Sequence, residues 1–285
     1  MKESKDIEKA LAAARRHFEV KEYKNAKLMY FNAQNLTTDE HTKAIIWAEL
    51  SWVYYYEGDF EKSIEAAENV LMHDPDYKAL GDLYRVQGYG YLALRNDKLA
   101  EKYLVDSLQF DFDSEKQHYV KYELGKIYFV RGQYDQAYPY FRQISDFFSE
   151  NDVEYYMSIL FYLGFIYYYL ENNEKSREDF EKILKLRPKP SREASALFGL
   201  AFLEFREKNY LNVISLCEKI ISLDDNFFDR ESVGFLTAAS YFYLGRKDIF
   251  HEYYEQMIKT YPDGRYTEEL KRLNIISPHT DSKTE

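Results

Sequence analysis

The chain has 285 residues but only 11 glycines and 6 prolines, so it lacks the turn residues that an all-β protein of this length needs, and an all-α fold is predicted. Its formal net charge of −11 argues against nucleic-acid phosphates and anionic lipid headgroups as partners, because like charges repel. The single cysteine, Cys217, excludes an intramolecular disulfide and is typical of a reducing compartment.

The N-terminal segment, MKESKDIEKALAAARRHFEV, carries charges every few positions and has no apolar stretch, so it does not resemble a secretory signal. With Met1 as the native start, a cytoplasmic location is expected. The uncharged run YYMSILFYLGFIYYYL, residues 155–170, is shorter than the roughly 20 apolar residues of a membrane-spanning helix. We therefore expect no membrane span, and this run is either a buried core or a binding surface.

A repeat of about 37 residues runs through the sequence. Each unit has a residue in its first half that is always small, which we call the anchor, and most units have a tyrosine three residues later and a second small residue twelve residues later. The seven anchors are Ala14, Ser51, Gly88, Gly125, Gly164, Ala201 and Ala238. Prolines 24 residues after three anchors, at Pro75, Pro188 and Pro262, mark the end of a second helix. Each unit is therefore predicted to be a helical hairpin.

Taken in chain order, the predicted elements form one solenoid over residues 5–276. The seven hairpins are expected at about 7–40, 44–77, 81–114, 118–151, 157–190, 194–227 and 231–263. A capping helix at about 264–276 is expected to cover the last apolar face, and residues 277–285 are expected to form a disordered tail. Two extra residues near FFSENDVE leave an alternative, in which the solenoid breaks between four repeats and three.

The second unit carries the residues of a known repeat. Its matching positions are Trp47, Leu50, Ser51, Tyr54, Gly58, Phe60, Ser63, Ala67 and Pro75. This pattern resembles the tetratricopeptide repeat, whose usual length is 34 residues. The resemblance implies a right-handed superhelical α-solenoid of seven such hairpins that serves as a protein-protein interaction scaffold. Glu204 in the sixth unit and Phe250 in the seventh depart from the pattern, because they replace a tyrosine and a small residue.

A second stripe of each first helix is expected to be a binding surface. In proteins that resemble this one, the residues three before, one after and four after the anchor line a concave groove. Fourteen of these 21 residues are aromatic here, where a solvated helix face should be polar. The predicted groove residues are Trp52, Tyr55, Tyr89, Tyr122, Phe129, Phe161, Phe165, Tyr168, Phe198, Phe202, Phe205, Phe235 and Phe242. Arg15, Arg85 and Lys126 lie in the same stripe and are candidate counter-charges for an acidic ligand. The alternative is that contact between neighbouring repeats, or the capping helix, buries the stripe.

The sequence predicts no enzyme. None of the six histidines has a second histidine at metal-ligand spacing, and there is no glycine-rich phosphate loop. Cys217 falls on the inner face of a second helix, where a small buried residue is expected. We therefore expect no catalytic residue, no cofactor and no metal site.

The predicted partner is another protein that presents an apolar or amphipathic segment to an aromatic groove. This makes the chain a scaffold or a chaperone-like adaptor. One alternative is an envelope-assembly scaffold of the periplasmic type, because YPDGRYTEELKRL resembles the repeat ends of such proteins. Another is single-stranded nucleic-acid binding through stacked bases, which the net charge disfavours. A second copy of the chain filling the groove would give a homodimer.

Overall fold

The predicted all-α class is confirmed. The computed structural model describes residues 2–110 and 114–276, and over these ranges it has fifteen helices and no strand. The predicted disordered tail, 277–285, lies outside the described residues. In the described part of the chain, no helix is long and apolar enough to cross a membrane.

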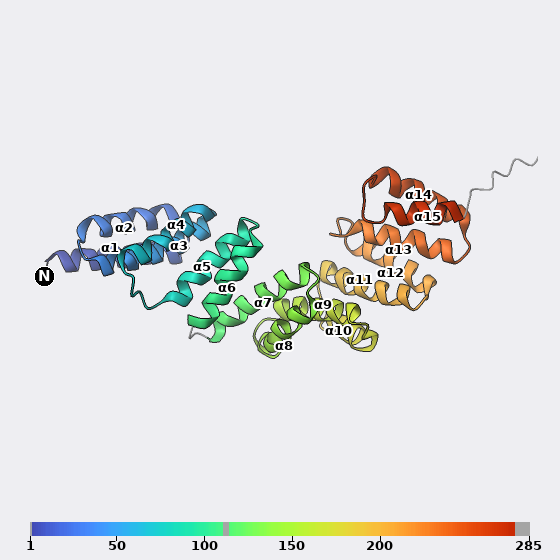
Figure 1. Ribbon diagram of the computed structural model, residues 1–285, viewed down its shortest axis with the longest axis horizontal. Coiled ribbons are helices and arrows are strands. Elements are labelled where there is room, and N and C mark those ends of the chain that lie inside the picture. Colours follow the sequence, from blue (N-terminus) through green and yellow to red (C-terminus); the bar gives the residue numbers. More distant parts are fainter. Residues whose placement is uncertain (1, 111–113, 277–285) are drawn as a thin grey trace, which may run out of the picture. The chain divides into compact units, whose positions relative to one another are not determined.

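The chain divides into two compact units, Met1–Arg131 and Gly132–Glu285. The helices of the N-terminal unit are α1 (Lys2–Glu19), α2 (Tyr23–Leu36), α3 (Glu40–Glu57), α4 (Phe60–His73), α5 (Leu80–Ala93), α6 (Asp97–Phe110) and α7 (Ser114–Val130). Those of the C-terminal unit are α8 (Tyr134–Asn151), α9 (Val153–Tyr169), α10 (Asn173–Lys185), α11 (Pro190–Arg206), α12 (Tyr210–Leu223), α13 (Arg230–Tyr243), α14 (Lys247–Thr260) and α15 (Thr267–Ile276). Within each unit, consecutive helices pack as hairpins (Figure 1).

The turn inside every hairpin has the same backbone conformation. The residue seven positions after each anchor has a positive φ of 57° to 90°, which is uncommon for residues other than glycine. These residues are Lys21, Gly58, Arg95, Gly132, Glu171, Lys208 and Gly245. A left-handed residue one or two positions after a helix lets the following amide bond back to a carbonyl of the last turn. Asp59 N–H, for example, donates to Tyr54 O at 3.0 Å. The repeat of 37 residues therefore follows one turn geometry.

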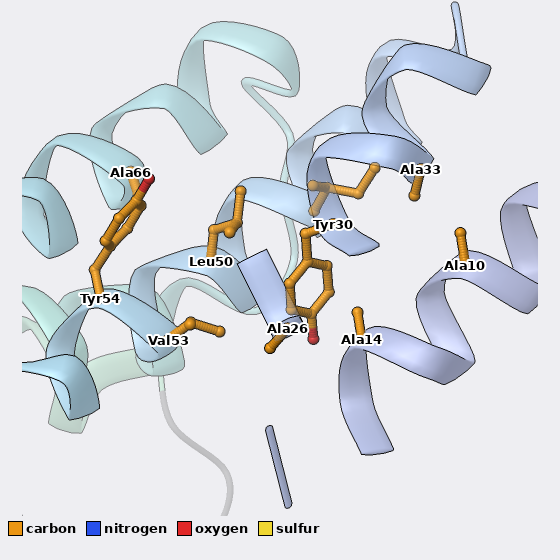
Figure 2. Close-up of a cluster of buried hydrophobic side chains, with 10 residues drawn as sticks. Ala10, Ala14, Ala26, Tyr30, Ala33, Leu50, Val53, Tyr54 and Ala66 are labelled. Atoms are coloured by element: carbon orange, nitrogen blue, oxygen red, sulfur yellow. The ribbon is translucent and has the colours of Figure 1, made fainter. Parts of the chain in front are cut away.

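Small residues allow the two helices of a hairpin to approach closely. Ser63 in α4 and Ser176 in α10 are fully buried, and their hydroxyls donate to the carbonyls of the anchors Ser51 and Gly164 at 2.8 Å. In the N-terminal unit, Tyr30 of α2 lies among small side chains of α1 and α2 and Leu50 of α3 (Figure 2). The core is therefore a series of similar clusters, each shared by neighbouring hairpins.

The seventh hairpin fills its core differently. Phe250 is fully buried in α14, at the position where most other repeats have a small side chain. It packs in one cluster with Met257 of α14 and with Leu270 and Leu273 of α15. The last helix therefore covers an apolar surface that a following repeat would otherwise bury.

Candidate aromatic binding face

The C-terminal unit presents aromatic side chains on three neighbouring helices. Helix α11 contacts both α9 and α13, so the first helices of three successive hairpins lie side by side. We call the predicted groove residues on these helices the aromatic face: Phe161, Phe165, Tyr168, Phe198, Phe202, Phe205, Phe235 and Phe242. The structure brings them together in two clusters.

The first cluster joins α9 and α11. The ring of Phe165 has its centroid 5.0 Å from Phe161 and 6.0 Å from both Phe198 and Phe202. Tyr168 approaches Phe202 to 5.8 Å. Most of these contacts are edge-to-face, the arrangement that the aromatic quadrupole favours. The rings therefore form a continuous apolar layer across two helices.

The second cluster joins α11 to α13. Phe205 lies 6.1 Å from Phe235 and 6.1 Å from Tyr243. Phe235 in turn stacks on Tyr266, just before α15, with 4.1 Å between ring centroids. The capping segment therefore covers one end of the aromatic face, and Phe242 packs against the buried Phe250.

Burial divides the aromatic face into a floor and an accessible layer. Phe165 and Phe198 are each only 4% exposed and belong to the core. The other six residues of the face are partly exposed. Outside the stripe, Phe228 in the loop before α13 is 68% exposed and lies 5.7 Å from Phe198. Part of the aromatic face is therefore packed in the core, and the rest is an accessible aromatic surface.

The predicted groove residues leave out a row of residues along the edge of this face, of which the sequence placed only Tyr169 at the edge. They lie five positions after the anchor, at the ends of α9, α11 and α13, and we call them the rim row: Tyr169, Arg206 and Tyr243. Each contacts the first residue of the preceding hairpin's second helix. Tyr169 stacks on Tyr134 at 4.3 Å, and Tyr243 stacks on Tyr210 at 5.0 Å. The period itself could have revealed the row, because the position recurs with the anchor.

The tyrosines of the rim row are accessible hydrogen-bond donors. Tyr169 is 47% exposed and Tyr243 is 48% exposed. Burial and the adjacent Tyr134 raise the pKa of Tyr169 to about 12, so its hydroxyl stays protonated at neutral pH. A partner would therefore meet flat apolar rings that carry polar edges, which is the character of residues that dominate protein interfaces.

Arg206 takes the place of a tyrosine in the rim row. Its guanidinium carbon lies 3.4 Å from the ring centroid of Tyr168. Its Nη1 donates to Tyr168 O at 2.7 Å and to Asn173 Oδ1 at 2.9 Å. The cation is therefore held flat against the aromatic face by neutral groups.

The N-terminal unit contains a related aromatic cluster. Trp52 lies 5.8 Å from Tyr55 and 6.4 Å from Tyr89, while Tyr56 stacks on Tyr23 at 6.4 Å. The Trp52 indole Nε1 donates to Asp82 at 2.8 Å. On α7 of the same unit, the predicted groove residue Tyr122 is buried and Phe129 is partly exposed.

The three candidate counter-charges already have carboxylate partners. Arg15 pairs with Glu49 at 2.6 Å, and Lys126 pairs with Glu123 at 2.8 Å. Arg85 is buried, pairs with Asp82 and lies over the Trp52 ring. These side chains therefore contribute little net positive charge to the predicted stripe.

Cys217 is not an activated nucleophile. Burial raises the pKa of the Cys217 thiol to about 11, so the thiol is protonated at neutral pH and is a poor nucleophile. Among the described residues, no three His, Cys, Asp or Glu side chains are placed to hold a metal ion. What the structure offers is a surface for contact.

Comparisons with known proteins agree with this architecture. A family model described as tetratricopeptide repeat matches residues 158–190, which include most of α9 and all of α10. No curated protein matches the sequence.

Solved structures with a similar fold cover most of the chain. The pilF protein of Pseudomonas aeruginosa is 18% identical, with 82% of this chain and 98% of that chain covered and a TM-score of 0.57. A tetratricopeptide repeat protein from Parabacteroides merdae is 18% identical, with coverages of 82% and 86% and a TM-score of 0.62. The C-terminal part of a repeat protein from Cytophaga hutchinsonii is 14% identical, with coverages of 91% and 98% and a TM-score of 0.59. At these identities, the likeness establishes a common fold.

Proposed function

We propose that this chain, a tetratricopeptide-repeat protein by its matched repeat and its fold, is a non-catalytic, chaperone-like adaptor that binds an apolar or amphipathic segment of another protein. The observation that carries the proposal is the aromatic face of the C-terminal unit, where rings from three adjacent helices form an accessible surface. The segment would lie across α9, α11 and α13.

Packing within the chain accounts for only part of this surface. The buried Phe165 and Phe198 already fill the space between α9 and α11. Partly exposed rings such as Phe202 and the tyrosines of the rim row add apolar area that stays in contact with water. Covering such area is favourable by about 25 cal/mol per Å², so a partner that covers several rings gains substantial binding energy.

Single-stranded nucleic acid is a poorer occupant. Stacked bases need nearby cations to neutralise the phosphates. The candidate cations of the predicted stripe, Arg15, Arg85 and Lys126, are each paired with a carboxylate. A protein segment, which requires no such neutralisation, fits the surface better.

Selection of peptides from a random display library tests the proposal, with binding then measured by calorimetry. We expect apolar or amphipathic peptides to be enriched and to bind the wild-type chain. The triple variant Tyr169→Ser/Phe202→Ser/Tyr243→Ser should weaken their binding at least about tenfold, because interface aromatics typically contribute 1–2 kcal/mol or more each. Phe165→Glu is unsuitable, since that side chain is buried.

The control is Ile275→Ser, which removes an exposed apolar side chain from α15 outside the aromatic face. It should leave peptide affinity unchanged. Thermal melting should show that the control and the triple variant are both folded. Failure to enrich any peptide, or equal affinity for the triple variant and the wild type, would reject the proposal. A concentration-dependent dimer lost in the triple variant would instead identify a second copy as the occupant.

A further inference from the structure

The rim row places a cation between two tyrosine pairs. Tyr169, Arg206 and Tyr243 occupy the same position in three successive hairpins, and α11 lies between α9 and α13. At the two outer positions, a tyrosine stacks on the preceding hairpin. At the central position, the same contact is a hydrogen bond from Arg206 to Asn173. The side chains of the rim row are therefore, in chain order, aromatic, cationic and aromatic.

The Arg206 cation has no carboxylate partner in the described part of the chain. Its Nη1 donates to one backbone carbonyl and one amide oxygen, both neutral. Over the described residues nothing accepts from Nε or Nη2, which form the edge of the guanidinium that takes a carboxylate in two parallel hydrogen bonds. Arg206 is therefore oriented by its neighbours, while its Nε and Nη2 donors have no acceptor among the described residues.

The two acidic residues closest to Arg206 in sequence pair with another arginine. Arg177 of α10 binds Glu204 at 2.7 Å and Glu207 at 2.8 Å, and these are the acidic side chains closest to Arg206 in sequence. Among the described residues Arg206 thus forms no ion pair, although the chain has a net charge of −11. A ligand that brings one carboxylate to this point complements the surface.

We propose that Arg206 binds the side-chain carboxylate of an aspartate or glutamate inside an extended, proline-rich segment of a partner protein. The proposal rests on the proposed function and names the partner's chemistry. A carboxylate within the segment, and not one at its C-terminus, fits because tyrosine pairs flank Arg206 on both sides. The chain must continue in both directions to cover them.

A polyproline II segment matches the separation expected between neighbouring packed helices. Packed helices are separated by about 8–10 Å, and three residues of polyproline II advance about 9 Å. This helix has three residues per turn, so every third side chain returns to the same face. Prolines docking on aromatic rings is a recognised mode of peptide binding. The expected pattern is Pro-x-x-Glu-x-x-Pro, with each proline on a tyrosine and the glutamate on Arg206.

Calorimetry with one synthetic peptide and its variants tests this assignment. The peptide is Pro-Ala-Ala-Pro-Ala-Ala-Glu-Ala-Ala-Pro-Ala-Ala-Pro, acetylated and amidated so that its glutamate is the only carboxylate. Replacing that glutamate by glutamine should weaken binding to the wild-type chain by about tenfold, the effect of losing a charge-assisted hydrogen bond. With Arg206→Gln, the two peptides should bind equally and as weakly as the glutamine peptide binds the wild type.

The matched control is Arg187→Gln, which makes the same charge change at an exposed arginine after α10. It should preserve the preference for glutamate. Adding one alanine on each side of the glutamate should weaken peptide binding by a similar factor, because the prolines are then no longer aligned with the tyrosines. Equal affinity of the glutamate and glutamine peptides for the wild type would overturn the proposal, as would tighter binding of a peptide that ends in a free carboxylate.

Failure of this inference is separable from failure of the proposed function. If library-selected peptides bind and lose affinity in the triple variant while neither proline peptide binds, only the assignment to a proline-rich acidic segment is rejected. If the proline peptides bind the triple variant as tightly as the wild type, they bind elsewhere and again only this assignment is rejected. Both proposals are rejected when the library-selected peptides also bind the triple variant as tightly as the wild type.

Discussion

At the scale of single residues, burial disfavours the charged form of Asp179 in α10. One of its oxygens, Oδ2, is buried and has no hydrogen-bond partner. Burial raises the pKa of Asp179 to about 7, and the nearby Lys182 only partly offsets this. The folded chain therefore binds a proton at pH values where the unfolded chain, with an ordinary aspartate pKa near 4, has lost it.

This linkage predicts how stability depends on pH. As pH rises from about 4 to 7, the contribution of Asp179 to the free energy of unfolding falls, and above 7 its penalty is constant. Asp179→Asn removes the charge at similar volume, so it should stabilise the chain by about 2–4 kcal/mol at pH 8 and by much less at pH 4.5. Urea unfolding at the two pH values measures this. An equal effect at both would show that Asp179 does not titrate in this range.

The charged residues show what sequence can tell about a site. The pairs Arg85–Asp82 and Lys126–Glu123 join residues three positions apart on one helix, so they were predictable from helical spacing alone. The pair Arg15–Glu49 joins α1 to α3, and only the packed structure brings these residues together. That Arg206 has no carboxylate partner among the described residues could not be recognised from sequence, because Arg177 binds the neighbouring Glu204 and Glu207 only in the packed structure.

At the scale of elements, two glycines in neighbouring helices make room for one ring. Phe180 of α10 is fully buried and lies against Gly164 of α9 and Gly199 of α11. A Cβ atom on Gly199 would come within 2.2–2.5 Å of three Phe180 ring atoms, and one on Gly164 within 2.7–3.1 Å. The glycines therefore set how closely α9 and α11 approach α10.

Gly199→Ala should destabilise the chain by about 1–3 kcal/mol, because a buried ring has no free space to move into. Alanine favours a helix by about 1 kcal/mol over glycine, so a merely local effect would have the opposite sign. Chemical denaturation measures the free energy of unfolding and so distinguishes destabilisation by a clash from stabilisation by helix propensity. Combining the change with Phe180→Leu should recover part of the loss, and full additivity of the two substitutions would argue against a direct clash.

The elements themselves were largely predictable, whereas the contacts along the edge of the binding face were not. The anchor period located the helical hairpins, because the same small residue and the same left-handed turn recur in each. The helical stripe used to predict the groove covers three positions and stops one residue short of Tyr169 and Tyr243. Stacking between hairpins, as in Tyr210–Tyr243, joins residues 33 positions apart and needs the packed structure.

At the scale of the whole molecule, the hairpins contact mainly their neighbours in sequence, as expected for a linear array. In the sequence, the boundary between the two compact units falls between α7 and α8, within the predicted fourth hairpin. That all hairpins form one continuous solenoid stays a prediction. In such an array, a local defect should spread only to adjacent elements.

The capping helix provides a test of this behaviour. Leu270 is 1% exposed and packs with Phe250 and Met257 in the last core cluster. Leu270→Asp would bury a charge, so we expect α15 to detach and α13 and α14 to lose protection against hydrogen exchange. Helices α1–α4, in the other unit, should exchange as in the wild type. Mass spectrometry of exchanged fragments would resolve the two regions.

Ile275→Asp is the matched control, because it introduces the same charge at an exposed position of the same helix and should leave every region unchanged. A uniform loss of protection in Leu270→Asp, extending to α1–α4, would mean that the chain unfolds as a single cooperative structure. Loss confined to α13–α15 would instead show that stability is set hairpin by hairpin. The aromatic face, which ends on α13, would then depend on the cap at that end only, since Phe235 stacks on Tyr266 there.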